Sequence, residues 1–278
     1  MTSTPKAKAK VVVPWHRKEE RDAFVEAWGL NVVPAFLHFQ QDADRAGCGA
    51  TKNRGVIAAA AAGAEIVVVL DGDCYPAEEA PTLEELLEHH VLALEPQPVE
   101  MYQPVTYPSS RGVPYFDLTL TMPVAASMGF WLNVPDYCAV RQLAFAEEGD
   151  VMRFTRDTVF QRYFPLCGMN VAFKPDAWWP WWQFIDVSRF DDIWMGWLWQ
   201  REAYRRGFCF NLNGPLITHS RQSNVWKNLI DEARYLEQTE NLWKEIAQNS
   251  AGDYATLLRL LPTGIHSLSD SPTRPWVK

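Results

Sequence analysis

The sequence predicts an α/β fold in which a mainly parallel central sheet is flanked by helices. Strand-like apolar runs alternate with helical segments over the first 95 residues, an order that implies crossover helices between parallel strands. The run Glu65–Leu70 is apolar apart from its first residue, as in strands buried on both faces of a parallel sheet. Neither a linker nor an internal repeat divides the 278 residues. We therefore expect a single domain over residues 1–262 and a surface tail over residues 263–278.

Three elements are expected before residue 40. Val11–Val13 is a β-branched run, which predicts a buried first strand. Lys18–Trp28 follows it with apolar residues at helical spacing. Asn31–Phe39 is again rich in apolar residues and predicts the second strand. Together these segments make the first β-α-β unit.

The next unit begins with a helix at Thr51, whose hydroxyl oxygen can accept an otherwise unpaired backbone N–H. This helix is expected to run to Ala62, and the strand Glu65–Leu70 follows. A third helix is expected from Thr82, with its apolar residues on one stripe. Because this helix is otherwise acidic, we expect its two adjacent histidines, His89 and His90, to face solvent.

The second half of the chain is less regular. Short extended pieces and prolines are frequent from residue 99 to residue 173. Helical patterns return after Phe190, and a helical C-terminal part is expected over about residues 224–262. The predicted helices are Asp191–Arg206, Asn224–Gln248 and Tyr254–Leu261.

Composition excludes several classes of protein. Lys and Arg number 26 against 34 Asp and Glu, and the net charge of −8 is unlike that of a duplex nucleic-acid binder. The five cysteines form no C-x-x-C pair, so we expect reduced thiols and a cytoplasmic location. The apolar stretch Ile57–Leu70 is broken by Gly63 and Glu65, so no membrane span is expected. Because the dinucleotide and Walker glycine motifs are absent from the sequence, neither flavin nor NAD is expected.

The first chemical signal is Asp71-Gly72-Asp73, directly after the buried strand. Ligands of open α/β sheets bind at the carboxyl ends of the strands. Two carboxylates at this position can hold a divalent cation, which in turn can hold a diphosphate. The alternative is an ordinary polar turn, which Asp-Gly favours.

Basic residues supply a second signal. Lys52, Asn53 and Arg54 open the alanine-rich helix, and a helix N-terminus with basic side chains suits an anion such as phosphate. The alternative is a solvated helix end. We group these residues, Arg17, Asp71 and Asp73 as candidates for binding a phosphorylated ligand.

Two more signals lie near the end of the chain. Asp191 and Asp192 begin a predicted helix, where they can serve as helix caps or as a general base. His219 follows an apolar strand-like piece and can be the third ligand of a metal held by Asp71 and Asp73. A lone histidine can equally be an ordinary polar residue.

These segments together resemble the reversibly glycosylated polypeptide family, whose plant members are UDP-arabinopyranose mutases. The resemblance covers roughly residues 10 to 245, in the family's order. It is carried by Leu70-Asp71-Gly72-Asp73-Cys74, by the segments at residues 129–137 (GFWLNVPDY), 164–173 (FPLCGMNVAF) and 189–197 (RFDDIWMGW), and by His219-Ser220.

The resemblance implies a GT-A-like nucleotide-sugar-binding fold, a UDP-sugar substrate and Mn²⁺ or Mg²⁺. It implies metal ligation by Asp71, Asp73 and His219, and it places Asp191 and Asp192 near the sugar. Arg111, followed by Gly-x-Pro, matches the family's reversibly glycosylated arginine, although a small insertion is needed to align it. The substrate contacts that we expect are Trp131, Asn170 and Trp194. Core packing is the alternative for the tryptophans.

This chain has Asp-Gly-Asp where the family usually has three aspartates, so both outer carboxylates are retained. Three functions are compatible with the sequence: a UDP-pentose mutase, a glycosyltransferase with a separate acceptor, and a nucleotide-sugar-binding subunit. Arg111 can accept the sugar or hold the diphosphate, since a guanidinium stays protonated and is a poor nucleophile. Plant members form complexes, so a homo-oligomer is a further expectation.

Overall fold

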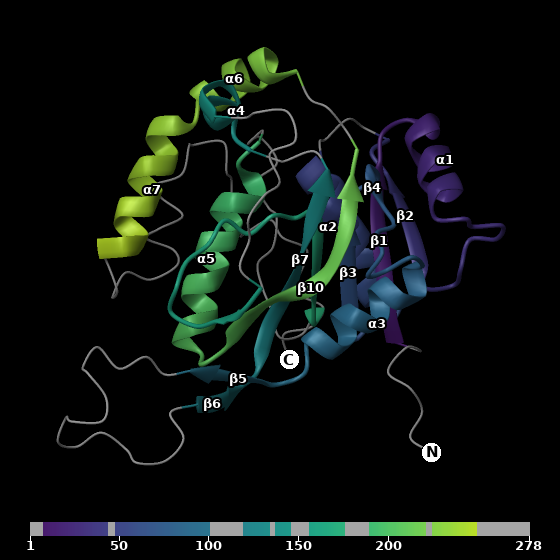
Figure 1. The fold of residues 1–278 in the computed structure, drawn as a ribbon, viewed down its shortest axis with the longest axis horizontal. Helices are drawn as coiled ribbons and strands as arrows, with labels where there is room; N and C mark the ends of the chain where they lie inside the picture. Colours follow the sequence, from purple (N-terminus) through teal and green to yellow (C-terminus); the bar gives the residue numbers. More distant parts are fainter. Residues whose placement is uncertain are drawn as a thin grey trace.

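An eight-stranded mixed sheet forms the centre of the molecule (Figure 1). The computed structural model describes residues 8–43, 48–100, 119–133, 137–145, 156–175, 189–220 and 224–248. Arg111 lies outside these residues, as do the tryptophan-rich segment Trp178-Trp179-Pro180-Trp181-Trp182, the predicted helix at 254–261 and the tail from residue 263. Within the described residues, the helices lack the combination of length and apolarity that crossing a bilayer requires.

The sheet confirms the predicted α/β class. Its strand order is β2-β1-β3-β9-β7-β10-β4, and β8 pairs with β10. Because β9 pairs antiparallel with both β3 and β7, strands β1, β2, β3, β7 and β10 all run in one direction. The bounds are β1 (Ala9–Trp15), β2 (Leu37–Gln41), β3 (Ile66–Leu70), β4 (Cys74–Tyr75), β7 (Val124–Asn133), β8 (Thr158–Val159), β9 (Asn170–Phe173) and β10 (Cys209–His219).

Helices cover both faces of this sheet. Helix α3 (Leu83–Ala93) packs on one face, and α2 (Cys48–Ala61) and α5 (Asp191–Arg205) pack on the other (Figure 1). The remaining helices are α1 (Lys18–Ala27), α4 (Ala139–Phe145), α6 (Val225–Ala233) and α7 (Leu236–Gln248). The predicted helix at 224–248 is thus two helices. The central strands are buried on both faces, as their continuous apolar sequence predicts.

A separate two-stranded sheet lies at the amino end of β7. It consists of β5 (Gln97–Glu100) and β6 (Thr119–Met122), and Glu100 pairs with Thr119. Glu100 and Thr119, the described residues on either side of positions 101–118, therefore lie toward the end of β7 opposite to Asn133 (Figure 1).

Two local predictions about the helices were wrong. The structure has Thr51 buried inside α2, which already begins at Cys48. His90 is fully buried, because its position continues the apolar stripe of Leu83, Leu86 and Leu87 on α3. The predicted start of α3 at Thr82, in contrast, is confirmed: Thr82 caps the helix, and its Oγ1 accepts the backbone N–H of Glu85 at 3.2 Å.

Candidate functional site

Three of the predicted site residues lie at the edge of the sheet where the five like-directed strands end. Asp71 and Asp73 follow β3, and His219 is the last residue of β10. Register places His219 opposite Cys74 of β4 and beside Asn133 at the end of β7. The two halves of the predicted site, which are about 150 residues apart in the sequence, therefore meet at this edge.

Lys52 joins the first acidic motif to the opposite half of the site. Its ammonium lies 2.6 Å from Asp71 Oδ1 and donates to the carbonyl oxygen of Gly168 at 3.0 Å. Burial disfavours the charged ammonium, but Asp71, with smaller contributions from Cys48 and Asp192, offsets this and holds the pKa of Lys52 well above its usual value. Lys52 thus points into the site from the fifth position of α2, and not from a free helix end.

The second acidic motif is anchored to the same residue, Gly168. Its backbone N–H donates to Asp192 Oδ2 at 2.9 Å, and its carbonyl accepts from Lys52. A short chain of contacts therefore runs from Asp71 through Lys52 and Gly168 to Asp192. The two acidic motifs are held in one site by side-chain and backbone groups of β3, α2, the turn before β9 and α5.

Asp191 has the electrostatics of a proton-transfer group. Burial, followed by the neighbouring Asp192 carboxylate, raises the pKa of Asp191 to about 7, and the nearby Lys52 ammonium opposes that rise. A carboxyl that titrates near neutral pH can take up or release a proton during a reaction. The two carboxyls lie in the first turn of α5 and titrate as an interacting pair.

Asp73 and His219 form the other part of the site. Asp73 Oδ2 lies 3.6 Å from His219 Nε2, and both side chains are largely buried. A carboxylate oxygen and an imidazole nitrogen at this spacing suit a divalent cation such as Mn²⁺. Asp71, the third predicted ligand, is instead directed to Lys52. Within the described ranges, three or more His, Cys, Asp or Glu side chains are nowhere gathered closely enough to hold a metal.

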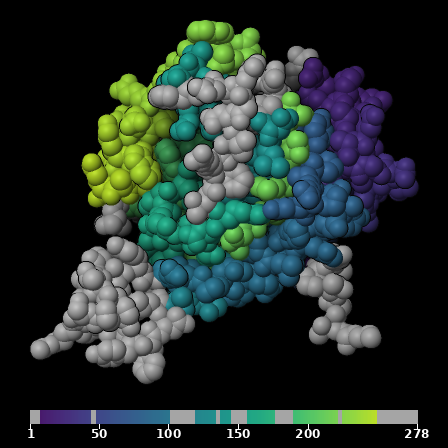
Figure 2. Space-filling view, viewed as in Figure 1, coloured from purple at the N-terminus to yellow at the C-terminus, as the bar shows by residue number. Residues whose placement is uncertain are grey.

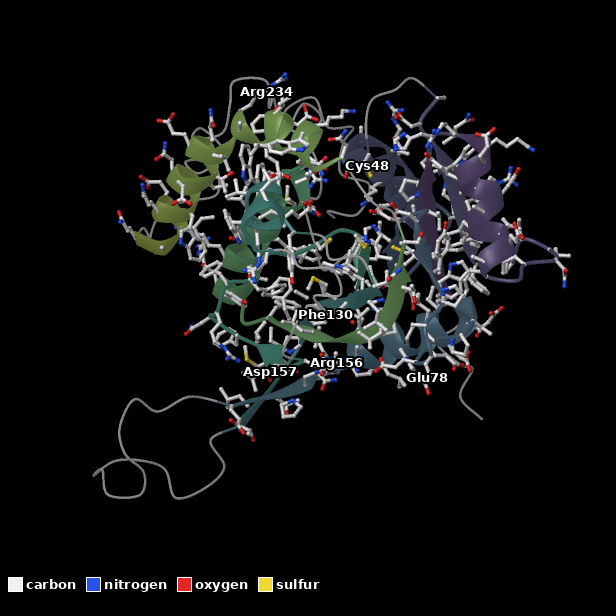
Figure 3. All side chains as sticks on the ribbon, turned by 45° about the horizontal axis from the view of Figure 1, so that its top comes forward. Cys48, Glu78, Phe130, Arg156, Asp157 and Arg234 are labelled. Carbon is white, nitrogen blue, oxygen red and sulfur yellow. The ribbon has the colours of Figure 1, made fainter. Side chains whose placement is uncertain are left out.

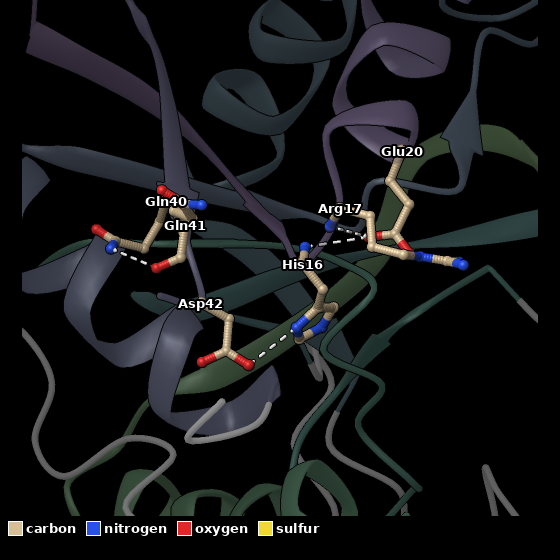
Figure 4. Close-up of polar contacts among 6 residues, drawn as sticks. All are labelled: His16, Arg17, Glu20, Gln40, Gln41 and Asp42. Carbon is tan, nitrogen blue, oxygen red and sulfur yellow. Dashed lines mark hydrogen bonds and ion pairs between the residues drawn. The ribbon is translucent and has the colours of Figure 1, made fainter. Parts of the chain in front are cut away.

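The other candidates for binding a phosphorylated ligand are Arg17, Asn53 and Arg54. Arg17 is exposed and donates through Nε and Nη2 to Glu20 of α1 at 2.9 and 2.8 Å (Figure 4). Asn53 is half-buried and Arg54 is exposed on α2. All three residues are more open to solvent than Lys52, which is buried.

Sequence reasoning missed one ion pair at this edge. His16 follows β1 and Asp42 follows β2, and His16 Nδ1 lies 2.9 Å from Asp42 Oδ2 (Figure 4). The Asp42 side chain is nearly fully buried, whereas His16 is partly open to solvent. Asp42 was not expected at a strand end, because β2 ends at Gln41 and not at the predicted Phe39.

The predicted substrate contacts are buried in the core. Trp131 is 6% exposed near the end of β7. Trp194 is fully buried, donates from Nε1 to Thr239 Oγ1 at 2.9 Å and stacks on Phe190. These contacts fit the alternative that tryptophans anchor the core.

Asn170 is fully buried between the sheet and α3. His90 Nε2 lies 2.8 Å from Asn170 Oδ1, and Asn170 Nδ2 donates to the carbonyl of Pro215 at 2.8 Å. Ser127 Oγ lies 3.0 Å from His90 Nδ1. A Cβ at Gly129 would lie 2.2 Å from Asn170 Nδ2, so this network requires glycine there. Asn170 therefore braces β7, β9 and β10 beneath the site.

Comparison with known proteins identifies relatives of this chain. The family model described as reversibly glycosylated polypeptide matches residues 60–249. A probable UDP-arabinopyranose mutase 1 of Pisum sativum is 33% identical over 184 residues, which are 60% of this chain and 50% of the relative. UDP-arabinopyranose mutase 3 of Arabidopsis thaliana is 31% identical over 186 residues, with the same coverage of 60% and 50%.

The chain spans about half the length of the curated relatives that it matches. The matched region nevertheless covers more than half of this chain, and it contains Asp71, Asp73, Asp191, Asp192 and His219. The chain belongs to the reversibly glycosylated polypeptide family.

Proposed function

We propose that this chain binds a UDP-sugar at the carboxyl edge of its sheet and interconverts the pyranose and furanose forms of a UDP-pentose, as a UDP-arabinopyranose mutase does. One observation carries the proposal: Lys52 and Gly168 hold the Asp71-Gly72-Asp73 motif and the Asp191-Asp192 pair in a single site. The names of the relatives support UDP-arabinopyranose as the substrate.

The acidic pair supplies the proton chemistry of the proposed reaction. The bond between the anomeric carbon and the diphosphate oxygen breaks, and its electron pair leaves with UDP. The ring then changes from pyranose to furanose: one sugar hydroxyl loses its proton as it becomes the ring oxygen, and the former ring oxygen gains one. Asp191, with its pKa near neutrality, is suited to take the first proton and to supply the second. UDP then re-forms the anomeric bond.

Asp73 and His219 are the residues that would hold a divalent cation. Such a cation would neutralise charge on the diphosphate. Asp71 contributes indirectly in this proposal, because it fixes Lys52 beside the cation site. Lys52 in turn places one buried positive charge among the four carboxylates of the two motifs, which lowers their mutual repulsion.

Product analysis tests the proposed function. The purified chain is incubated with UDP-arabinopyranose and Mn²⁺, and the nucleotide sugars are separated by chromatography. We expect UDP-arabinofuranose to form with the wild type and to be lost with Asp191→Asn. Free arabinose or a glycosylated acceptor would instead indicate a glycosyltransferase, and binding without turnover would indicate a nucleotide-sugar-binding subunit. Either of those results overturns the mutase proposal.

A further inference from the structure

An arginine in an unusual backbone conformation precedes the acidic pair. Arg189 has φ of +75°, in the left-handed region that residues other than glycine seldom adopt. Such a conformation persists where surrounding contacts determine it. Here the contact is with Glu232 of α6: Arg189 Nε and Nη2 both donate to Glu232 Oε1, at 3.0 and 2.9 Å.

Glu232 is a buried junction between three segments. It is 1% exposed, and besides Arg189 it accepts the backbone N–H of Ala139, at 2.7 Å to Oε2. Its carboxylate therefore ties the segment before α5 and the start of α4 to helix α6. A buried carboxylate with three donors is a fixed point, because moving it leaves charged and polar groups unpaired.

The orientation of α6 shows how strongly these polar contacts act. The helix buries Asn228 and Glu232 and turns Trp226 and Ile230 outward, at 65% and 64% exposure. An amphipathic helix packed by its apolar face alone would have the reverse orientation. α6 lies on the outer surface at the top of the molecule in Figure 2, so polar contacts, and not burial of Trp226 and Ile230, set its orientation.

The acidic pair depends on the same contacts. Phe190, the residue that caps α5, makes no side-chain hydrogen bond to the helix N-terminus, and Asp191 begins the helix immediately after it. The backbone path into that first turn is therefore set by Arg189, two residues before Asp191. A change of its φ toward the common negative values would redirect the chain at the point where the acidic pair enters the site.

We propose that Glu232 is a positioning residue for the acidic pair, holding Arg189 and thereby the backbone that places Asp191 and Asp192 beside Lys52. The proposal rests on the proposed function only in so far as the pair acts on a UDP-sugar. The placement itself can be measured without turnover.

The test compares Glu232→Gln with a matched control, Glu79→Gln. Glu79 also receives two hydrogen bonds from an arginine, at 2.6 and 2.7 Å from Arg156, and accepts a backbone N–H from Leu216. Figure 3 shows its partner Arg156 low in the view, far from Cys48, the first residue of α2, near the top. Both substitutions keep the shape of the side chain and remove its charge.

Hydrogen–deuterium exchange of the folded variants measures how firmly the backbone at the start of α5 is held. We expect the amides at the start of α5 to exchange about tenfold or more faster in Glu232→Gln, and at the wild-type rate in Glu79→Gln. With UDP-arabinopyranose, kcat of Glu232→Gln should fall by about tenfold to a hundredfold while KM changes less than about twofold. The reason is that a displaced Asp191 carboxyl slows proton transfer more than it weakens substrate binding.

Arg189→Lys supplies an independent variant if Glu232→Gln fails to fold, because it keeps the charge and loses the two-pronged contact. It should reproduce the faster exchange at α5, and adding it to Glu232→Gln should change nothing further. Exchange at α5 equal to that of the wild type in whichever of these variants folds overturns the positioning role. An inactive wild type whose variants still show faster exchange overturns the proposed function and leaves the positioning role standing.

Discussion

Acidification should destabilise this protein through His90. The ring is fully buried between Ser127 and Asn170, and burial lowers its pKa to about 4 from an ordinary value of 6.5. In the neutral form, Nε2–H donates to Asn170 Oδ1 and Nδ1 accepts from the Ser127 hydroxyl, so both nitrogens are paired. A second proton would turn Nδ1 from an acceptor of the Ser127 hydrogen bond into a donor and place a charge in the core.

The pKa of His90 differs between the folded and the unfolded chain, and this difference sets how its titration changes the free energy of unfolding. Above pH 6.5 both folded and unfolded chains carry neutral His90, and the effect is absent. Between pH 6.5 and 4 the unfolded chain binds the proton first, so the free energy of unfolding decreases as the pH is lowered. The two pKa values differ by about 2.5, which lowers the free energy of unfolding by about 3 kcal/mol at a pH below both values and by about 2 kcal/mol at pH 5.

Urea unfolding at pH 7 and pH 5 measures this effect. The free energy of unfolding of the wild type should fall by about 2 kcal/mol more between these pH values than that of His90→Gln. His89→Gln removes the exposed histidine one residue away and serves as the control, with the pH dependence of the wild type. Equal pH dependence in His90→Gln and the wild type would refute the assignment of this loss to His90.

The other predictions concern the site and the strands beneath it. Lys52→Met should destabilise the fold by about 3–5 kcal/mol, because it leaves a buried carboxylate without its cation; a loss below 1 kcal/mol in urea unfolding would contradict the buried ion pair. Asp192→Asn should shift the limb of the kcat/KM profile assigned to Asp191 from near pH 7 to lower pH, because the like charge that raises this pKa is gone; an unmoved limb would remove Asp191 from that role. Gly129→Ala should lower the free energy of unfolding by about 1–3 kcal/mol, since its Cβ meets the Asn170 amide at 2.2 Å; wild-type stability would show that the strands can separate there freely.

Several elements of the first half follow from local signals, and the structure confirms them. The predicted strand Asn31–Phe39 is confirmed only in its last three residues, because β2 begins at Leu37. The β-branched run at Val11–Val13 lies inside β1, and the apolar run at Glu65–Leu70 contains β3. Thr82 and Glu85 form the capping box of α3, which is a contact between residues three apart. Such signals need nothing from the rest of the chain.

His90 shows where local reasoning fell short although the sequence held a signal. Its spacing from Leu83, Leu86 and Leu87 continues the apolar stripe of α3, whereas its acidic neighbours suggest a solvent-facing helix. His90 is buried because it lies on the apolar face of α3. Its burial is tolerated because Ser127 and Asn170 pair with both ring nitrogens.

The sequence indicates which residues form the candidate site, but it does not indicate which of them contact one another. Asp71, Asp73 and His219 stand after strands, and the rule of carboxyl ends brings them to one edge. The contact of Lys52 with Asp71 and Gly168 joins positions up to 116 residues apart, and no pattern along the chain specifies it. The capping rule predicted that the helix begins at Thr51. With that start, Lys52 was expected at an open helix end, whereas it lies in the second turn of α2 and points toward Asp71.

Calorimetric titration of UDP-arabinopyranose into the protein in the presence of Mn²⁺ tests most directly whether this edge of the sheet is the nucleotide-sugar site. We expect saturable binding of one ligand per chain with the wild type and with Glu79→Gln, and binding weakened by about tenfold or more with Asp73→Asn. No measurable binding to the wild type, or equal affinity in Asp73→Asn, would contradict the account.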